Sequence, residues 1–509
     1  MAGSRAVARA RRMSRREDAE ALVDGAQAAI GDEGTAEVIG APAQADPAPG
    51  VWRRLLARVP RSAAAGEVGW VTISYAVGQA MRLATNIVLA RLLAPQLFGI
   101  MLIVNTLRTG IELLSDIGIS HNIISNPRGA EPAFFNTAYT LQIIRGAVLG
   151  VAVLVLAVPI SRIYQQPELT ALVPLMSVLF VLSALQAPSR FLMMKQGEVR
   201  AYAISDIALA VGSLVIHVAL ALYTRSIWAL FLGLILTTAL QSIVTHLLME
   251  RGVLKLQLDR TCMREILSFG KWVFVSSLIY FLAINYDRLY FAKAIPFAVL
   301  GVYGVARTFS DTATQLIQRV GSILIYPKIA ASGQQGWALR AALAPVRARA
   351  LLLIAVPLSL GVAVSDRVIT LLYDARYHAA AAMLPVLMLG VWFSVLSTIG
   401  DAVMMGTGRP AHSARANLAK FVFTCAGLPL ALAWNGMLAA LLVIAGGDLV
   451  RYLSLALSER AHKVSFGRQD AALTLLLAGM VVVWRTILVT LGLAPDAATF
   501  WSYAATLHG

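Results

Sequence analysis

The chain has 509 residues, of which 58% are hydrophobic and only 14% are charged, and its mean hydropathy is +0.72. Because soluble domains carry about 25% charged residues, this composition excludes an ordinary soluble protein and predicts a membrane protein. The formal net charge of +16 would suit nucleic-acid binding. The two cysteines are far apart and the seven histidines show no HxxxH or HExxH spacing, so a disulfide framework, a metal site and an enzyme gain no support.

Residues 1–60 are predicted to form a disordered cytoplasmic tail. Six arginines between Arg5 and Arg16 are followed by eight acidic residues and no basic one between Glu17 and Asp46. The tail lacks the apolar core of a signal peptide. At its end, the basic amphipathic segment 51–61 is predicted to lie on the anionic cytoplasmic leaflet, and a plain linker is the alternative.

Thirteen apolar stretches then follow, each long enough to cross a bilayer. They lie at 68–90, 97–118, 137–160, 170–187, 202–223, 226–248, 271–292, 297–325, 348–371, 381–404, 412–434, 436–458 and 470–492. With a cytoplasmic N-terminus and strict alternation, the cytoplasmic loops hold nineteen lysines and arginines and the outward loops six. This is the distribution that the positive-inside rule requires. The charge is therefore explained by topology, and no nucleic acid is expected as a partner.

An internal repeat predicts the architecture. A shift of 202 residues places Leu97 and Gly99 over Val299 and Gly301, and the Met-Met pair at 193–194 resembles that at 404–405. We therefore expect an all-α, polytopic membrane protein with two six-helix lobes, related by a pseudo-two-fold axis along the membrane normal, plus one or two C-terminal helices. The predicted parts are the tail (1–60), the first lobe (61–249), a cytoplasmic linker (250–270), the second lobe (271–458) and an extra transmembrane helix with an outward end (459–509).

Polar residues recur at helical spacing inside three of the spans. The stripes are Tyr75, Gln79, Arg82 and Asn86 in the first span, Asn105, Arg108, Glu112 and Asp116 in the second, and Tyr303, Arg307 and Asp311 in the eighth. Since an arginine that faces lipid costs a few kcal/mol or more, the stripes predict a water-filled, cationic cavity. The alternative is packing by helix-to-helix hydrogen bonds and ion pairs such as Arg108 with Glu112 and Arg307 with Asp311.

Several runs resemble a known family. They are LARLLAPQLFGIMLIV (89–104), SDIGIS (115–120), SFGKWVFVSSLIYFLAINYDRLYFAK (268–293), with its Asn-x-Asp-Arg at 285–288, and LGVYGVAR (300–307). They are similar to the polysaccharide and O-antigen flippases (Wzx-type) of the multidrug/oligosaccharidyl-lipid/polysaccharide (MOP) exporter superfamily. The resemblance implies a bacterial inner-membrane transporter, not an enzyme, that flips an undecaprenyl-pyrophosphate-linked oligosaccharide (O-antigen, capsule or exopolysaccharide repeat unit) by alternating access through a cationic cavity. It also implies as partners the lipid-linked oligosaccharide, membrane lipid and other polysaccharide assembly proteins.

The stripes and the resemblance together assign roles. Arginine binds phosphate in a bidentate fashion and stays charged when partly desolvated, so the predicted anion contacts are Arg82, Arg108, Arg307, Arg145 and Arg288. The predicted sugar contacts are Tyr75, Gln79, Asn86, Asn105 and Tyr303. Glu112, Asp116 and Asp311 are either counter-ions or sites for a coupling proton or sodium ion, and Asp287 is a counter-ion or a lock between the lobes. No cofactor and no resident metal are expected.

Three other functions compete with this one. A lipid II flippase shares the expected cavity and substrate chemistry. A drug/cation antiporter of the same superfamily would need an acidic cavity, and the cavity predicted here is cationic. A membrane polysaccharide polymerase or ligase would usually carry catalytic residues in a large outward loop. The longest outward loop here, around 366–380, is short, although it holds Tyr373, Asp374, Arg376, Tyr377 and His378.

Overall fold

The computed structural model describes residues 67–115, 118–119, 123–124, 126–196, 198–248, 254–324, 335–407 and 409–494. Within these ranges the chain forms helices joined by short connections and no strand, which confirms the all-α class. The predicted tail, the first residues of the predicted linker (250–253) and the end after 494 lie outside the described residues.

The helices follow each other along the whole described chain. They are α3 (Glu67–Leu92), α4 (Pro95–Leu114), η1 (Pro127–Ala130), α6 (Pro132–Tyr164), α7 (Pro167–Ala184), α8 (Ser189–Lys195), α9 (Val199–Thr224), α10 (Ile227–Leu247), α11 (Arg260–Ala294), α12 (Phe297–Leu324), α14 (Gly336–Leu372), η2 (Ala375–Tyr377), α15 (Ala380–Gly406), α16 (Ala411–Ala461) and α17 (Gly467–Thr490). Proline stands in the first turn of α4, α6 and α7, where its missing N–H has no helical partner to lose.

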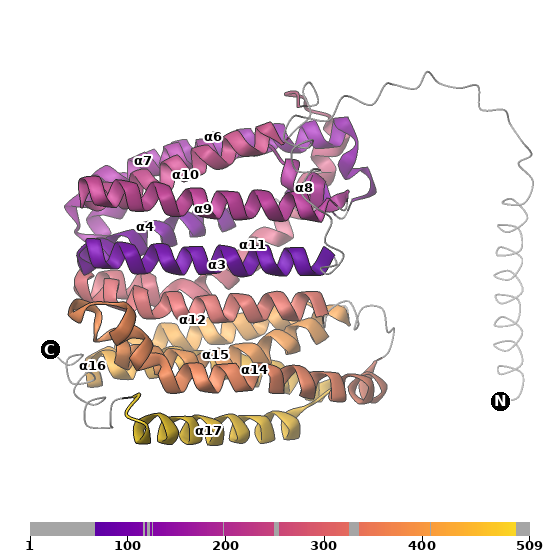
Figure 1. The fold of residues 1–509 in the computed structure, drawn as a ribbon. Helices are drawn as coiled ribbons and strands as arrows, with labels where there is room; N and C mark the ends of the chain where they lie inside the picture. The colour runs from indigo at the N-terminus through magenta and orange to yellow at the C-terminus, as the bar shows by residue number, and fades with distance from the viewer. Residues whose placement is uncertain are drawn as a thin grey trace, which may run out of the picture. The chain divides into compact units, whose positions relative to one another are not determined.

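The long helices run in alternating directions, and each predicted span matches one pass (Figure 1). α16 supplies two passes, because its backbone leaves the helical region at Asn435 and Gly436, where Gly436 has a φ of 63°. Nine of the described helices are long and apolar enough to cross a membrane. α3, α11 and α12 are not among these nine, and they carry predicted polar stripes and site residues. The chain is a multi-pass membrane protein.

The ends of the bundle differ in charge. We call the end that carries the loops predicted to be cytoplasmic the basic face, and the other end the opposite face. Two of the nineteen basic residues counted there are buried: Lys420 and Arg347 form ion pairs with Asp448 and Asp470, respectively. They therefore carry no information about topology, although the excess of basic loop residues remains.

The predicted repeat is visible where α4 and α12 meet at the opposite face. A Cβ atom added at Gly99 would lie 2.0 Å from the carbonyl oxygen of Phe297, and one added at Gly301 would lie 1.9 Å from that of Pro95. The contact is reciprocal between residues that the shift of 202 makes equivalent. A pseudo-two-fold axis between the first half (α3 to α10) and the second half (α11 to α16) explains this reciprocity.

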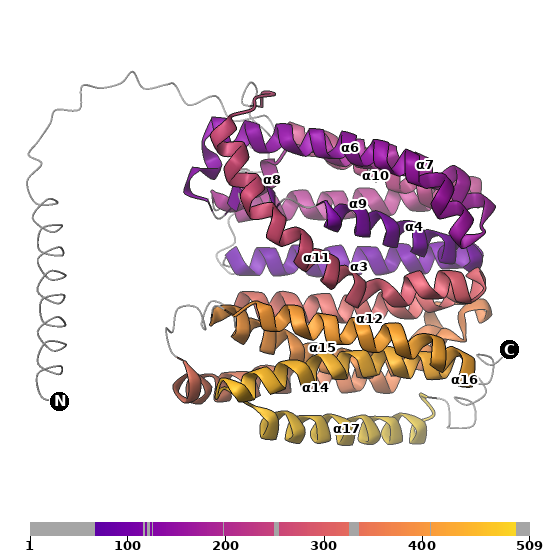
Figure 2. The same ribbon diagram turned by 180° about the vertical axis from the view of Figure 1, so that it is seen from behind.

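α11 crosses from one half to the other (Figure 2). Its first turns pack against α6, where Cys262 is fully buried. The chain before it runs along α6: the backbone N–H groups of Lys255 and Asp259 donate to the side chains of Asn136 and Thr137, at 2.9 and 3.0 Å. Further along, α11 packs against α4 of the first half and against α16 of the second, and its last turns also contact α12. α11 is therefore anchored in both halves.

The extra helix, α17, packs along α14 (Figure 1). An ion pair between Arg347 and Asp470 holds one end, and both side chains are almost fully buried. Arg485 Nη1 lies 2.7 Å from Asp366 Oδ2 nearer the other end. α17 is thus fixed to α14 at two levels.

Candidate functional site

A cavity of about 360 Å³ lies between the two halves. It is bounded by α3, α4, α9, α10 and α12, and three residues predicted from the sequence line it: Arg82, Asn86 and Asn105. The lining also includes His217 of α9 and Thr308 of α12. His217 and Thr308 were not predicted as site residues. Both are polar residues inside predicted spans, which is the same signal that indicated Arg82, Asn86 and Asn105.

The stripe on α3 faces α12 beside this cavity. The exposed guanidinium of Arg82 donates to Gln315 Oε1 at 3.2 Å and to Thr312 Oγ1 at 3.5 Å. Gln79 donates to the same Gln315 oxygen at 3.2 Å and to the Tyr75 hydroxyl at 2.7 Å. In the described part of the chain Arg82 has no carboxylate within ion-pair distance. Its positive charge is left to a ligand or to water.

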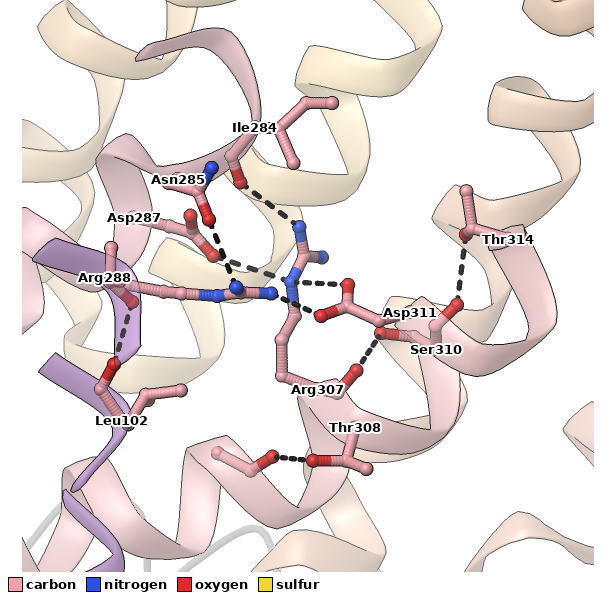
Figure 3. A network of polar contacts seen from close by, with 12 residues as sticks. Leu102, Ile284, Asn285, Asp287, Arg288, Arg307, Thr308, Ser310, Asp311 and Thr314 are labelled. Carbon is pink, nitrogen blue, oxygen red and sulfur yellow. Dashed lines mark hydrogen bonds and ion pairs between the residues drawn. The ribbon is translucent and has the colours of Figure 1, made fainter. Parts of the chain in front are cut away.

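A second group of predicted residues comes together where α11 meets α12. Arg307 lies between two carboxylates (Figure 3): its Nε atom is 3.3 Å from Asp311 Oδ1 and 3.6 Å from Asp287 Oδ2. Arg288 also forms an ion pair with Asp311 and donates to Asn285 Oδ1 at 3.0 Å. Spacings of three and four residues place Asn285 beside Arg288 and Arg307 beside Asp311 on their helices.

This group is buried, and its charges balance. The hydroxyl of Tyr303 donates to Asp287. The side chains of Asp287 and Arg307 are only 4% and 10% exposed, and Tyr303 is fully buried. Asp287 thus contacts α12 of the second half, and none of these residues lines the cavity that holds Arg82.

More charged residues of the second half lie near Arg307. Lys420 Nζ is 2.6 Å from Asp448 Oδ1, and Arg451 forms an ion pair with Asp401. With Arg307 and Asp311, the residues Lys420, Asp448 and Arg451 line a small cavity of about 50 Å³. Charged residues inside the eleventh and twelfth predicted spans were the available signal, but their partners lie on other passes and are not visible in the sequence.

The remaining predicted residues lie in the first half. Arg108 and Glu112 of α4 form the predicted ion pair, at 3.6 Å. Arg145 of α6 donates to Ser115 Oγ at 3.0 Å and to the carbonyl oxygen of Glu112 at 2.6 Å, so it caps the C-terminal end of α4. Arg145 and Glu112 line a separate cavity of about 460 Å³. Asp116 lies outside the described residues.

At the opposite face, two arginines join the halves reciprocally. Arg91, at the end of α3, donates to the carbonyl oxygens of Leu372 at 3.1 Å and Leu371 at 3.5 Å, at the end of α14. Arg376, in the loop after α14, donates to those of Ala90 at 3.2 Å and Arg91 at 3.3 Å. Each arginine therefore satisfies the carbonyl end of a helix in the other half. We call this pair the arginine latch.

Two tyrosines strengthen the same contact. The Tyr373 hydroxyl donates to Asn86 Oδ1 at 2.8 Å, and the Tyr377 hydroxyl donates to the carbonyl oxygen of Leu93 at 3.5 Å. A hydrogen bond from Arg376 lowers the pKa of Asp374 below its usual range and keeps it ionised. The polar loop that kept a polymerase or ligase under consideration thus holds the two halves together.

Comparisons with known proteins agree with this architecture. Residues 88–382 match the family described as "Polysaccharide biosynthesis protein". The chain is 25% identical to lipopolysaccharide biosynthesis protein WzxC of Escherichia coli (strain K12), over 76% of this chain and 78% of WzxC. It is 24% identical to teichuronic acid biosynthesis protein TuaB of Bacillus subtilis (strain 168), over 58% of this chain but only 62% of TuaB.

A solved structure shares the fold. The lipid II flippase MurJ in its inward closed conformation superposes with a TM-score of 0.65, covering 85% of this chain and 95% of MurJ at 11% sequence identity. The family match spans more than half of the chain, and it confirms the resemblance seen in the sequence. The chain therefore has the fold seen in MurJ and belongs to the polysaccharide biosynthesis protein family.

Proposed function

We propose that this protein flips an undecaprenyl-pyrophosphate-linked oligosaccharide across the bacterial inner membrane, and that Arg82 binds its pyrophosphate. The observation that carries the proposal is the position of Arg82. It stands at a cavity between two pseudo-symmetric halves, with only neutral hydrogen-bonding partners among the described residues. Family membership and the likeness to WzxC support the polysaccharide pathway.

The cavity suits such a substrate chemically. A pyrophosphate cannot cross hydrocarbon without donors that replace its water, because unpaired charges cost several kcal/mol there. Arg82 offers a planar fork for phosphate oxygens, while Asn86, Asn105 and Thr308 offer neutral partners for sugar hydroxyls. The polyprenyl chain would stay in the surrounding lipid. A bare cation would meet a positive charge at this cavity, which argues against a drug/cation antiporter.

We infer that transport runs from the basic face to the opposite face. With the basic face in the cytoplasm, the arginine latch closes the outward end of the cavity, and opening of the latch with closure at the basic face would release substrate outward. Asp311 and Glu112 are paired with arginines, which favours the counter-ion role over the coupling of a proton or sodium ion.

Replacement of Arg82 tests the proposal. Loss of a charge-assisted contact worth about 1.5–3 kcal/mol predicts a loss of affinity of roughly tenfold to a hundredfold in Arg82→Ala. Arg82→Lys should retain part of the function, because lysine keeps the positive charge but cannot donate the two parallel hydrogen bonds of a guanidinium group. The assay is translocation of a fluorescent lipid-linked oligosaccharide in proteoliposomes, together with the amount of folded protein. Arg162→Ala, an exposed change in the last turn of α6, is the control.

Arg307 gives a contrasting expectation. Its removal leaves Asp311 with Arg288 alone and Asp287 with only the Tyr303 hydroxyl among their described side-chain partners, so the buried group keeps one net negative charge. Arg307→Ala should therefore lower stability, by about 3–5 kcal/mol, before any effect on transport is measured. If Arg82→Ala is folded and transports at the wild-type rate, Arg82 does not bind the pyrophosphate.

A further inference from the structure

A fourth cavity lies at the basic face of the second half, away from the cavity between the halves. Its volume is about 450 Å³, and it is enclosed by the start of α14, the end of α15 and the turn between α16 and α17. The basic residues in its lining are Arg409, His462 and Lys463, and none of the described lining residues is acidic. The cavity is therefore cationic.

The two most basic side chains of this cavity have no acidic partner among the described residues. In the described part of the chain neither Arg409 nor Lys463 takes part in an ion pair, and neither side chain donates a hydrogen bond to a protein acceptor. The His462 ring faces that of His412, with 3.2 Å between the two Nε2 atoms. The N-cap residue of α14, Gln335, lines the cavity and its side chain makes no capping hydrogen bond, and the first N–H groups of the helix add positive potential.

The repeat does not account for these charges. The backbone N–H of Arg409 donates to the carbonyl oxygen of Met404 at 2.8 Å, just as that of Glu198 donates to Met193 in the first half, also at 2.8 Å. The position equivalent to Arg409 is thus acidic in the first half. The repeat therefore does not require a basic residue at this position, and topology requires only that the loops be basic.

The rim of the cavity points to a lipid. Trp337 lines the cavity and is 61% exposed, and the guanidinium of Arg340 stacks over its ring at 5.1 Å. Exposed tryptophan beside basic residues is typical of the membrane–water interface. Basic pockets between transmembrane helices at the cytoplasmic side bind the phosphates of lipid headgroups.

We infer that this cavity binds the phosphate headgroup of an anionic phospholipid of the leaflet at the basic face, with Arg409 and Lys463 as the phosphate contacts. Such a lipid would connect α14, α15 and the turn before α17. The inference is independent of the transported substrate, because the site lies outside the cavity between the halves.

The test uses the full-length protein purified in detergent, with thermal unfolding followed by tryptophan fluorescence. Short-chain phosphatidylglycerol should raise the melting temperature in a saturable manner, and phosphatidylcholine of the same chain length should not. In Arg409→Gln/Lys463→Gln the half-saturating concentration should rise about thirtyfold, since each basic residue near a headgroup contributes roughly a factor of five. Arg349→Gln/Arg468→Gln removes the same charge from exposed positions outside the cavity and should behave as wild type.

Three results would overturn the inference. One is an unchanged half-saturating concentration in Arg409→Gln/Lys463→Gln, and another is equal protection by phosphatidylcholine. The third is protection by inorganic pyrophosphate at the same concentration as phosphatidylglycerol, which would make the ligand a soluble phosphate compound instead of a lipid.

Discussion

Removal of the arginine latch should open the opposite face. In Arg91→Gln/Arg376→Gln, four hydrogen bonds from guanidinium groups to helix-terminal carbonyl oxygens are lost, with lengths of 3.1–3.5 Å. Both arginines are exposed and the bonds are long, so we assign about 1 kcal/mol to each arginine. Together they contribute about 2 kcal/mol, which corresponds to a roughly 30-fold increase in the open population.

Cysteine labelling measures that population. Leu93 is 1% exposed and lies beneath Tyr377, so a cysteine placed there reacts with a maleimide only when the halves separate. Cys262 and Cys425 are first replaced by alanine. When closing is faster than the chemical step, the labelling rate is proportional to the open population. We therefore expect labelling of Leu93→Cys to become about 30-fold faster in the latch variant.

The control removes two charges from the same face without touching the latch. Arg162 and Lys293 are exposed there, and Arg162→Gln/Lys293→Gln should leave the labelling rate unchanged. Labelling of the latch variant at the rate of the control would show that the guanidinium contacts contribute nothing to closure, and the reasoning from helix-terminal carbonyl groups would be refuted.

Three further predictions concern other parts of the molecule. Gly99→Ala puts a Cβ atom 2.0 Å from the carbonyl oxygen of Phe297 and should raise the labelling rate of Leu93→Cys. Gly78→Ala is the control, because its Cβ would have no atom within 4 Å. Equal labelling rates in the two variants would contradict the close contact between α4 and α12. Arg347→Met leaves the buried Asp470 without its counter-charge, although the Tyr452 hydroxyl still donates to it at 2.9 Å, and should cost about 3–5 kcal/mol of unfolding free energy. Arg347→Met/Asp470→Leu should recover most of the melting temperature, and a double variant as unstable as the single would argue against this cause. The pKa of Asp374 lies below its unfolded value of about 3.9. Its contribution to closure is therefore full above that pH and is lost as the pH falls through the folded-state pKa. Spin-label distances between the halves should stay constant from pH 7 to pH 5, and a change in that interval would exclude Asp374 as its cause.

The passes and the two-half architecture could be predicted from the sequence, because a bilayer requires about 20 apolar residues for each pass and the charge bias fixes their alternation. The stripe of α3 was also predictable. Tyr75, Gln79 and Arg82 share one face by helical period alone, and the structure places them next to one another or to α12.

Partners on distant passes could not be predicted. Lys420 was counted as a loop charge because nothing near it in the sequence indicates Asp448, which lies on the returning arm of α16. Arg91 was likewise treated only as an outward-loop charge, and its partners are backbone carbonyl groups, which every residue type carries and which therefore leave no pattern. That Arg307 lies in a buried network apart from Arg82 depends on the tilt of α11, which hydrophobic periodicity does not specify.

The crossing of α11 has a mechanical consequence. The connection before it is held along α6 by backbone hydrogen bonds at residues 255–259, so it supplies no slack when one half moves against the other. The strain would then fall on α11 itself, a 35-residue helix about 52 Å long. α11 would then have to bend between its two anchored ends when the halves move. Its bending stiffness, together with the thickness of the membrane around it, would set the cost of each cycle, so bilayers of different thickness should change the rate of transport without changing the affinity of the cavity.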